Sequence, residues 1–460
     1  MSFKFGFACA AALGVMGAFG PAANAADEAL RADIAKDYDA RLKDLFIHFH
    51  QNPELSFRET KTAARLAKEL RALGVQVTEG VGRTGVVGVL RNGEGPTVLI
   101  RADMDGLPVE EKSGLPYASK VRQVDLSGQE RPVMHACGHD VHVTALIGTA
   151  KQLVARKDRW KGTVVFVGQP AEETISGARA MLEDGLYTRF PRPDYALAFH
   201  VSADVPAGKI GLVPGLTSSS SDSVDIIVHG VGAHGASPHT GKDPIVIGAQ
   251  IVMALQTLVS REIAPLDPGV VTVGAFHAGH KHNIISDRAE LQLTVRSNDE
   301  AVRAKLLNGI KRIAENAGRM AGLPEDKLPE VRVGFESTPT TVNDAALTDR
   351  VRAVLAGQFG KDVFFTQARQ GMGAEDFAYF IQTDPKVPGA YFAVGGTSQA
   401  VLDAAAAGGP PVPSHHSPLF KIEPEPAVKA GVEAMTVAAL DLLNGAKPKG
   451  ETGNVAVSGQ

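Results

Sequence analysis

The segment Val98-Leu99-Ile100-Arg101-Ala102-Asp103 is an apolar run that ends abruptly in charged and polar residues. Two further runs have the same form, because Val164–Val167 leads into Gly168-Gln169-Pro170 and Ala196–Phe199 leads into His200. Short apolar runs of this kind are typical of strands that are buried on both faces. Open α/β sheets bind ligands beyond the carboxyl ends of their strands, so these polar residues lie where a site is expected.

The residues before the first of these strands follow a helical period. Leu66, Leu70 and Leu73 fall on one helical face, which ends at Gly74. The alternation of helix and strand patterns in this part of the chain indicates βαβ units. We therefore predict an α/β fold for the catalytic domain, with a mixed, mostly parallel sheet and helices on both of its faces.

A run of small polar residues, Thr217–Ser223, precedes a segment with a different pattern. Its composition is that of a flexible joint between domains. The elements predicted beyond it are a strand over 224–228, a helix over 244–260, strands over 270–276 and 289–295, and a helix over 300–320. This β-α-β-β-α order predicts a small two-layer α+β insertion. The α/β pattern then resumes and ends in a helix over 426–443.

The first residues have the features of an export signal. Lys4 is followed by an apolar run, Phe7–Phe19, and by Ala23-Asn24-Ala25, which fits an A-x-A cleavage site. A membrane anchor is the alternative, but the run is shorter than the ~20 residues that a bilayer span needs. We predict a cleaved signal and a periplasmic or secreted protein, and we expect no later segment to span a membrane.

These patterns give a predicted division of the chain. The predicted parts are a signal peptide over 1–25, the first part of the catalytic domain over 26–217, the inserted domain over 218–335, the second part of the catalytic domain over 336–445, and a disordered tail over 446–460. Two domains also suit the length, since domains usually contain ~100–200 residues.

Composition and charge narrow the classes of partner. The 460 residues are 44% hydrophobic and 21% charged, which suits a soluble globular protein. Their formal net charge is −4, so we expect no nucleic acid and no membrane as partner. The chain has two cysteines, and removal of the signal would remove Cys9. Cys137 would then be alone in an oxidising compartment, as a ligand, a nucleophile or a buried bystander.

The segment Met134-His135-Ala136-Cys137-Gly138-His139-Asp140-Val141-His142 concentrates three imidazoles, one thiol and one carboxylate. These groups are ligands for zinc and similar metals once the thiol is deprotonated. A thiol-histidine nucleophile pair is one alternative, and the polar start of a helix without any ligand role is another. A metal site would also need ligands from elsewhere in the chain.

Candidate partners follow later predicted strands. Glu172-Glu173 is a pair in which one carboxylate can bind a metal while its neighbour acts as a general base. His200 ends a strand, and His415-His416 follows a loop rich in glycine and proline. Asp103 and Asp105 form a D-x-D pair, which can orient ligand histidines or simply close a turn. Each of these signals is weak by itself.

Taken in order, the segments resemble the amidohydrolase branch of the aminoacylase/carboxypeptidase superfamily, which holds hippurate hydrolases and plant indole-acetyl-amino-acid hydrolases. The resemblance covers almost the whole mature chain. The matching motifs are His50-Gln51-Asn52-Pro53-Glu54-Leu55-Ser56, Arg101-Ala102-Asp103-Met104-Asp105-Gly106-Leu107-Pro108, Cys137-Gly138-His139-Asp140, Glu172-Glu173 before Ser176-Gly177, His200, Gly232-Ala233-His234-Gly235-Ala236-Ser237-Pro238-His239, Asn283-Ile284-Ile285-Ser286-Asp287, Gly373-Ala374-Glu375-Asp376-Phe377 and His416-Ser417-Pro418.

The resemblance implies a site for two divalent metal ions. The implied ligands are Cys137, His139, Glu173, His200 and His416. Thiolate and imidazole ligands favour zinc, with manganese, cobalt or nickel as alternatives. Glu172 would be the general base, and Asp105 would support a ligand histidine.

The resemblance also implies that the inserted domain is a lid and a homodimer interface. His234 would polarise the scissile carbonyl, within its own chain or across that interface. Asn283 and Arg296 would hold the carboxylate of the substrate. The implied reaction is hydrolysis of the amide bond of an N-acyl amino acid, or of a related carboxylate-bearing amide or dipeptide, by a metal-activated water.

Two features depart from the family pattern, and neither touches an implied ligand. The stretch Lys120–Pro132 is longer than usual and is expected to reshape the entrance to the site, and Ser286 stands where proline is more frequent. Two rival functions are a metal-independent hydrolase with Cys137 as its nucleophile and a two-lobed binding protein. The first leaves Glu173 without a role, and the second does not need Glu172.

Overall fold

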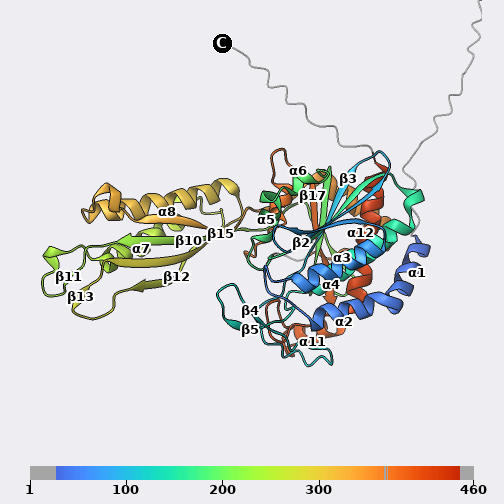
Figure 1. The fold of residues 1–460 in the computed structure, drawn as a ribbon, viewed down its shortest axis with the longest axis horizontal. Coiled ribbons are helices and arrows are strands. Elements are labelled where there is room, and N and C mark those ends of the chain that lie inside the picture. Colours follow the sequence, from blue (N-terminus) through green and yellow to red (C-terminus); the bar gives the residue numbers. More distant parts are fainter. Residues whose placement is uncertain (1–26, 367–368, 370, 446–460) are drawn as a thin grey trace, which may run out of the picture.

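The computed structural model describes residues 27–366, 369 and 371–445, so the predicted signal peptide and disordered tail lie outside the described residues. The described chain forms a larger body and a smaller, elongated one that projects from it (Figure 1). The larger body is built on a seven-stranded sheet with the order β1-β2-β6-β3-β7-β17-β8. These strands are β1 (Gln76–Val81), β2 (Gly85–Asn92), β3 (Thr97–Asp103), β6 (Gly162–Gln169), β7 (Tyr195–Pro206), β8 (Ile210–Gly211) and β17 (Gly389–Thr397).

The four central strands of this sheet are parallel. β3 pairs in parallel with both β6 and β7, and β7 pairs in parallel with β17. At the edges, β2 and β8 add antiparallel, and β1 continues the sheet beyond β2. The predicted α/β fold with a mixed, mostly parallel sheet is therefore confirmed.

Helices cover both faces of the sheet. Successive strand residues point to opposite sides, so the apolar strands give the sheet two apolar faces to bury. Ile100 and Phe166 belong to the hydrophobic cluster under α4 and α12, whereas Leu99 and Val165 belong to the cluster under α5 and α10. The helices of the larger body are α1 (Glu28–Asp37), α2 (Lys43–Gln51), α3 (Thr60–Ala72), α4 (His139–Ala155), α5 (Gly177–Glu183), α6 (Leu186–Arg189), α9 (Ala345–Phe359), α10 (Ala378–Ile381), α11 (Gln399–Ala406) and α12 (Pro424–Asn444).

The smaller body, here called the lid, has a four-stranded antiparallel sheet with the order β12-β14-β10-β15. Two helices, α7 and α8, pack on this sheet through a separate hydrophobic cluster. The elements are β10 (Ser220–His229), β11 (Ala233–His234), α7 (Pro244–Thr257), β12 (Gly269–Ala278), β13 (Ile284–Ile285), β14 (Arg288–Ser297), α8 (Glu300–Met320) and β15 (Glu330–Thr338). The last strand, β15, was absent from the predicted order.

The serine run before the lid was predicted as a flexible joint between domains, and the structure shows that most of it is strand. Ser218 ends β9 (Gly215–Ser218), β10 begins at Ser220, and Asp222 within that strand is buried. The Asp222 carboxylate accepts hydrogen bonds from Arg303 at 2.7 and 2.8 Å. A buried, paired carboxylate fixes the start of this strand, which composition alone could not reveal.

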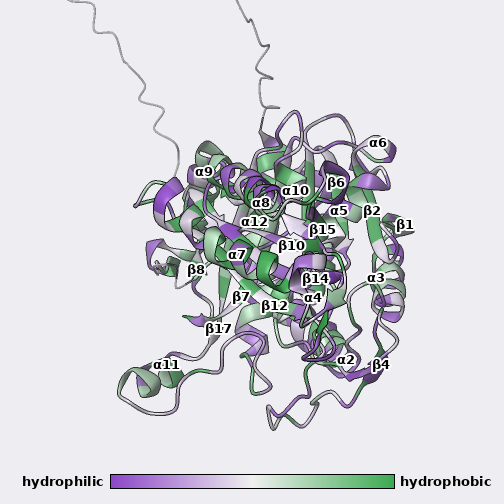
Figure 2. Ribbon diagram, turned by 90° about the vertical axis from the view of Figure 1, so that its left-hand side faces the viewer, coloured by the Kyte–Doolittle hydropathy of each residue, from purple (hydrophilic) through white to green (hydrophobic). Residues whose placement is uncertain are grey.

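One lid helix also corrects the expectation that no later segment could span a membrane. The residues Pro244–Glu262, which form α7 and the turn after it, are long and apolar enough by length and composition. Figure 2, which views the molecule from the lid side, shows α7 as largely hydrophobic. Ile247, Ile251 and Leu255 pack into the lid core, whereas Met253 is 72% exposed.

Two small pairs of strands complete the described structure. β9 pairs with β16 (Thr341–Asn343) where the chain passes between the two bodies. β4 (Arg122–Val124) and β5 (Glu130–Pro132) form a hairpin within the long stretch Lys120–Pro132. The hairpin lies on the larger body, away from the lid sheet (Figure 1).

Candidate metal centre

The predicted ligands meet at one edge of the central sheet. Cys137 and His139 lie at the start of α4, where Gly138 has a φ of 86°. A Cβ at this glycine would lie 2.2 Å from a Val201 side-chain carbon, so another residue would not fit without movement. His200 lies on β7, which continues beyond it to Pro206, so the prediction that the strand ends at this histidine is wrong. The strand continues because β17 pairs alongside it.

The donor atoms form overlapping groups whose members lie within 4.8 Å of one another. One group contains Cys137, His139 and His200, and another contains Cys137, Glu173 and His416. Cys137 belongs to both, with its Sγ 3.4 Å from Nε2 of His200. The Nε2 atom of His416 lies 3.3 Å from a Glu173 oxygen. The structure thus brings all five predicted ligands together.

Two of the histidines are oriented by backbone carbonyl groups. Nδ1 of His139 hydrogen-bonds to the Asp105 carbonyl oxygen at 2.8 Å, and Nδ1 of His200 hydrogen-bonds to the Val201 carbonyl oxygen at 2.7 Å. A carbonyl oxygen only accepts, so each Nδ1 must carry the proton. The Nε2 atoms are therefore left as the ligand atoms, as in metal sites where the other ring nitrogen fixes the tautomer.

Asp105 has a wider role than the predicted support of a histidine. Its carboxylate accepts hydrogen bonds from the backbone N–H groups of Glu172 and Glu173, each at 3.0 Å, and from Ser56. The contact of its carboxylate with Nδ1 of His139 is longer, at 3.4 Å. Asp105 therefore holds the glutamate pair through its side chain and the histidine mainly through its carbonyl oxygen.

The glutamate pair lies in a constrained loop. Ala171 and Ile175, on either side of the pair, have positive φ values of 50° and 44°. This region is unfavourable for a β-branched residue and recurs at functional sites. Oxygens of Glu172 and Glu173 each lie 3.8 Å from Nε2 of His139. Either carboxylate could thus reach an ion bound to this histidine.

Sequence reasoning singled out Asp103 but missed its main partner. The Asp103 carboxylate contacts Nδ1 of His142 at 2.5 Å and lies 3.7 Å from Nε2 of His139. Nε2 of His142 accepts a hydrogen bond from the backbone N–H of Val201. Both nitrogens of His142 are therefore engaged, so this histidine holds the ligand strand in place. The sequence signal that could have pointed to His142 was its place in the segment that concentrates histidines around Cys137.

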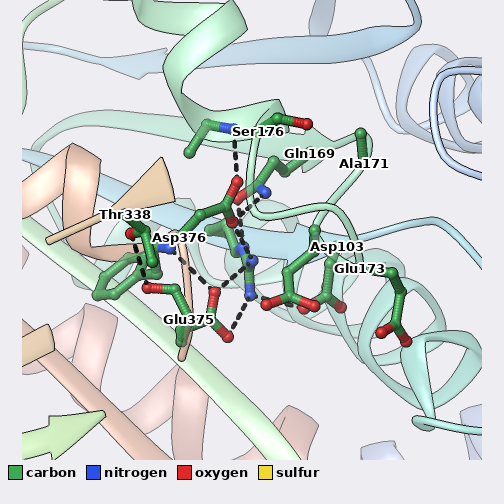
Figure 3. Close-up of polar contacts among 12 residues, drawn as sticks. Asp103, Gln169, Ala171, Glu173, Ser176, Thr338, Glu375 and Asp376 are labelled. Carbon is green, nitrogen blue, oxygen red and sulfur yellow. Dashed lines mark hydrogen bonds and ion pairs between the residues drawn. The ribbon is translucent and has the colours of Figure 1, made fainter. Parts of the chain in front are cut away.

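A buried arginine network lies directly behind the site. Arg101 donates to the carboxylates of Asp103 and Glu375 at 2.6 and 2.7 Å, and Asp376 lies beside them (Figure 3). Burial opposes ionisation of Asp103, but the Arg101 guanidinium holds its pKa well below its usual range. The R-x-D-x-D and G-A-E-D-F motifs supply this network, whose members the sequence could not pair.

The electrostatics of the site favour a bound cation. Burial and the neighbouring glutamates raise the pKa of the Cys137 thiol, and burial with nearby carboxylates raises the pKa of Glu173 to about 8. Burial lowers the pKa of His139, but Asp103 and other carboxylates outweigh this effect and raise it to about 10. Negative groups are thus crowded together without enough positive charge to balance them.

Two buried ligand atoms that lack a hydrogen-bond partner test whether a metal ion would fit this site. Nε2 of His139 and Oε1 of Glu173 are buried and have no hydrogen-bond partner among the described residues. Leaving such an atom unsatisfied costs about 1–3 kcal/mol. A cation would bind both atoms and balance the crowded charge, and thiolate, imidazole and carboxylate are metal ligands. The residues present therefore fit a metal centre.

The metal-ligand cluster faces a cavity of about 690 Å³ that lies between the two bodies. Its lining includes four of the five predicted ligands, Glu172, and Arg296 of the lid strand β14, whereas the fifth ligand, His139, is fully buried behind the wall. Neither His234 nor Asn283 lines it, because β11 and β13 lie at the far end of the lid (Figure 1). Within this chain the structure therefore brings one of the three predicted lid residues to the site.

The hairpin in the long stretch Lys120–Pro132 does not reach this cavity. None of its residues is among those lining the cavity in the described parts of the chain. Gln123 instead accepts a hydrogen bond from the backbone N–H of Leu55, on the side of the larger body. The expectation that this stretch reshapes the entrance is therefore wrong for the arrangement seen here.

Comparison with known protein families identifies the family to which this chain belongs. The model of peptidase family M20/M25/M40 matches residues 99–407. The chain therefore belongs to this family, and it is a metal-dependent amidohydrolase, as the sequence predicted.

Relatives and solved structures extend the match over most of the chain. A thermostable carboxypeptidase of Saccharolobus solfataricus is 39% identical over 80% of this chain and 88% of its own length. A hippurate hydrolase of Campylobacter jejuni is 37% identical over 75% of this chain and 86% of its own length. A Bacillus subtilis protein described as a dinuclear metal-binding peptidase of the M20 family is similar in structure, with a TM-score of 0.68 and 29% identity, over 89% of this chain and 99% of its own.

Proposed function

We propose that the protein hydrolyses the amide bond of N-acyl amino acids, with Glu172 as the general base. The observation that carries this proposal is the cavity itself, which has a cluster of metal ligands and Glu172 on one side and a guanidinium on the other. The names of two relatives support this substrate class. One is named hippurate hydrolase, and another, from Bacillus subtilis, is named N-acetyl-L-cysteine deacetylase.

The site is proposed to hold two divalent ions, with zinc as the preferred metal. Cys137 would contribute to both positions, with His139 and His200 completing one donor group and Glu173 and His416 the other. A thiolate and three imidazoles suit zinc better than a harder cation. The named dinuclear neighbour supports the number of ions.

The proposed reaction uses each of the remaining groups once. When bound, the ions lower the pKa of a water molecule and stabilise negative charge on oxygen. Glu172 takes a proton from the attacking water and later returns it to the nitrogen of the departing amine. The position of Glu172 is set by the hydrogen bond from its backbone N–H to Asp105. The products are a carboxylic acid and an amino acid.

Arg296 is proposed to bind the carboxylate next to the scissile amide. Its guanidinium lines the cavity and, in the described structure, its side chain donates to the Thr294 hydroxyl at 3.2 Å. A planar guanidinium matches a carboxylate in geometry and in charge. Substrates with a free acid group would therefore be preferred.

His234 and Asn283 are proposed to act on the cavity of a second copy of the chain. Both are exposed at the far end of the lid, where His234 accepts a hydrogen bond from the Ala236 N–H. The outer side of the lid helix α7 also exposes Val246 and Met253, which would suit a homodimer. In such a dimer, His234 of one chain would polarise the carbonyl bound by the other.

Export is proposed from the first residues alone. The expected mature protein begins at Ala26, after the A-x-A site. Mass measurement of the protein from its native host tests this directly, and an intact Met1 on the functional protein would contradict it.

The overall proposal is tested by metal analysis of the purified protein combined with a screen of N-acyl amino acids and dipeptides. Hydrolysis that stops after chelation and returns with added Zn²⁺ is expected. Activity that survives complete removal of metal would instead favour Cys137 as a nucleophile, and tight binding without turnover would favour a binding protein.

A further inference from the structure

A second arginine lines the same cavity. Arg369 lies in the loop before α10 and contributes to the main cavity together with Arg296. Its guanidinium donates to the Ser219 hydroxyl at 2.7 Å, and it lies 3.4 Å from the Asn298 side-chain oxygen and 3.5 Å from the Gly371 carbonyl oxygen. All three partners are neutral.

The lid sheet fixes the relation between the two arginines. Ser221 on β10 is paired with Arg296 on β14, so their side chains share one face. Ser219 and Asn298, the partners of Arg369, are each two residues from that pair along the chain. Two residues span about 7 Å along a strand. Arg369 therefore meets this face next to Arg296.

Neither guanidinium has an ionic partner in the part of the chain that the structure describes. Among the described residues, no carboxylate lies within 4.0 Å of Arg296 or Arg369, although most other arginines of the chain form such pairs. Burial lowers the pKa of both arginines, which means that each has lost part of its hydration. Glu336 also lines the cavity, but it forms no ion pair with either of them.

The space around Arg369 suits a side chain that carries a negative charge. A second cavity of about 340 Å³ adjoins the first, and the two share Thr217, Arg369 and Tyr391. The second cavity is also lined by Ser202, Thr366, the apolar residues Val213, Leu216 and Phe365, and Asp204, an exposed carboxylate that forms no ion pair with Arg369. Arg369 thus stands between the main cavity and a pocket with both polar and apolar walls.

We infer that Arg369 binds a second carboxylate of the substrate, so that the preferred amides are those of acidic amino acids, of which an N-acylglutamate is the simplest. Arg296 and Arg369 would then bind the two carboxylates of one substrate, while the scissile amide faces the metal ligands and Glu172. This inference rests on the proposed hydrolysis of N-acyl amino acids and specifies its substrate.

The test compares N-acetylglutamate with N-acetylglutamine, and N-benzoylglutamate with N-benzoylglutamine. The members of each pair have nearly the same shape and differ by one charge. The native enzyme should have a kcat/KM at least about tenfold higher for the glutamate member, as expected for a charged hydrogen bond. Arg369→Gln should remove this preference by lowering kcat/KM for the glutamate member alone, and Arg369→Lys should restore part of it.

Arg332→Gln is the matched control for the lost charge. Arg332 is an exposed lid residue that pairs with Glu330 and does not line the cavity, so the preference should remain. Equal losses on both substrates in Arg369→Gln would overturn the inference, because they would show that Arg369 merely supports the lid through Ser219. Hydrolysis of both members by the native enzyme without a preference would also overturn it, while leaving the proposed function intact. Failure to hydrolyse any N-acyl amino acid would reject the proposed function itself.

Discussion

Histidines occur at both ends of the molecule, and the two ends hold them in opposite ways. At the metal centre, His139 and His142 are buried, and hydrogen bonds fix the orientation of each ring. At the far end of the lid, His234 is exposed and its ring accepts a local hydrogen bond from Ala236. Metal ligands must be in position before the ion binds, whereas a group that meets the substrate can stay in water until then. The comparison therefore separates residues that build the site from residues that complete it.

The largest effect is expected from the two neighbouring glutamates, which this account gives different tasks. Glu172→Gln should lower kcat by about 10²–10⁴-fold, the usual contribution of a general base, while the metal content is retained. Glu173→Gln should instead lower the metal content, because it removes a ligand oxygen. Kinetics and metal analysis on both variants check the assignment. Loss of metal in Glu172→Gln, with retention in Glu173→Gln, would mean that the two roles are exchanged.

The next effect concerns the far end of the lid. His234→Ala should lower kcat by about 10²–10³-fold, because it removes a donor to the developing oxyanion. Its metal content should equal that of the native protein, since His234 belongs to β11, which lies at the far end of the lid from the ligands (Figure 1).

Mixing two inactive variants shows which chain supplies His234. If the histidine acts across a dimer, subunit exchange between His234→Ala and Glu172→Gln should restore about a quarter of the native activity, because half of the dimers are mixed and each has one complete site. If it acts within its own chain, mixing restores nothing. Sedimentation of the native protein as a monomer would exclude the dimer itself.

A smaller effect is expected from Arg296, on the cavity side of the lid. Arg296→Ala should penalise an N-acyl amino acid relative to its amide analogue by about 1.5–3 kcal/mol in transition-state binding, the range for a charged hydrogen bond. The ratio of kcat/KM values for the two substrates measures this difference. An equal loss on both would show that Arg296 does not bind the carboxylate.

The smallest effect concerns a buried histidine near the metal centre, and it is measured in the free energy of unfolding. His50 is buried and contacts the carboxylates of Asp140 and Glu111 at 2.7 and 3.1 Å. Burial opposes its ionisation, but these hydrogen bonds raise its pKa to about 9. A histidine whose pKa is raised on folding stabilises the protein fully below its ordinary pKa of about 6.5, and this contribution is lost as the pH rises through 9. The contribution is on the order of 1–3 kcal/mol.

Urea unfolding of the metal-loaded protein between pH 6 and 10 measures this term. His50→Gln should flatten the fall in the free energy of unfolding between about pH 6.5 and 9. His48→Gln is the control, because His48 lies on the same helix and burial lowers its pKa instead of raising it. An unchanged slope in His50→Gln would show that the ion pairs contribute nothing to stability.

The larger body and its metal centre were predicted from the sequence better than the lid was. Apolar strands that end in polar residues are a local pattern, and it placed β3 and β6 and the ligands beyond them. The serine run before the lid has the composition of a loop, yet it becomes strand because Asp222 finds Arg303 some 80 residues away along the chain. Such a pairing depends on tertiary structure, and no local pattern contains it.

The site shows the same limit. The five ligands were predicted from motifs, and the structure brings them together. The hydrogen bonds that orient them were not predictable, because the carbonyl groups of Asp105 and Val201 carry no signal in the sequence. Arg369 was also missed, since a lone arginine in a loop has no distinguishing pattern until its position in the cavity and its neutral hydrogen-bond partners are seen.

The buried site at the start of α4 is proposed to hold two metal ions, with Cys137 contributing a ligand atom to both. Metal analysis of the native protein and of Cys137→Ala, each purified without chelator and dialysed against metal-free buffer, tests this arrangement. Two divalent ions are expected per native chain, and Cys137→Ala should lose ions together with activity. One ion or none in a fully active native protein, or unchanged metal content in Cys137→Ala, would rule the arrangement out.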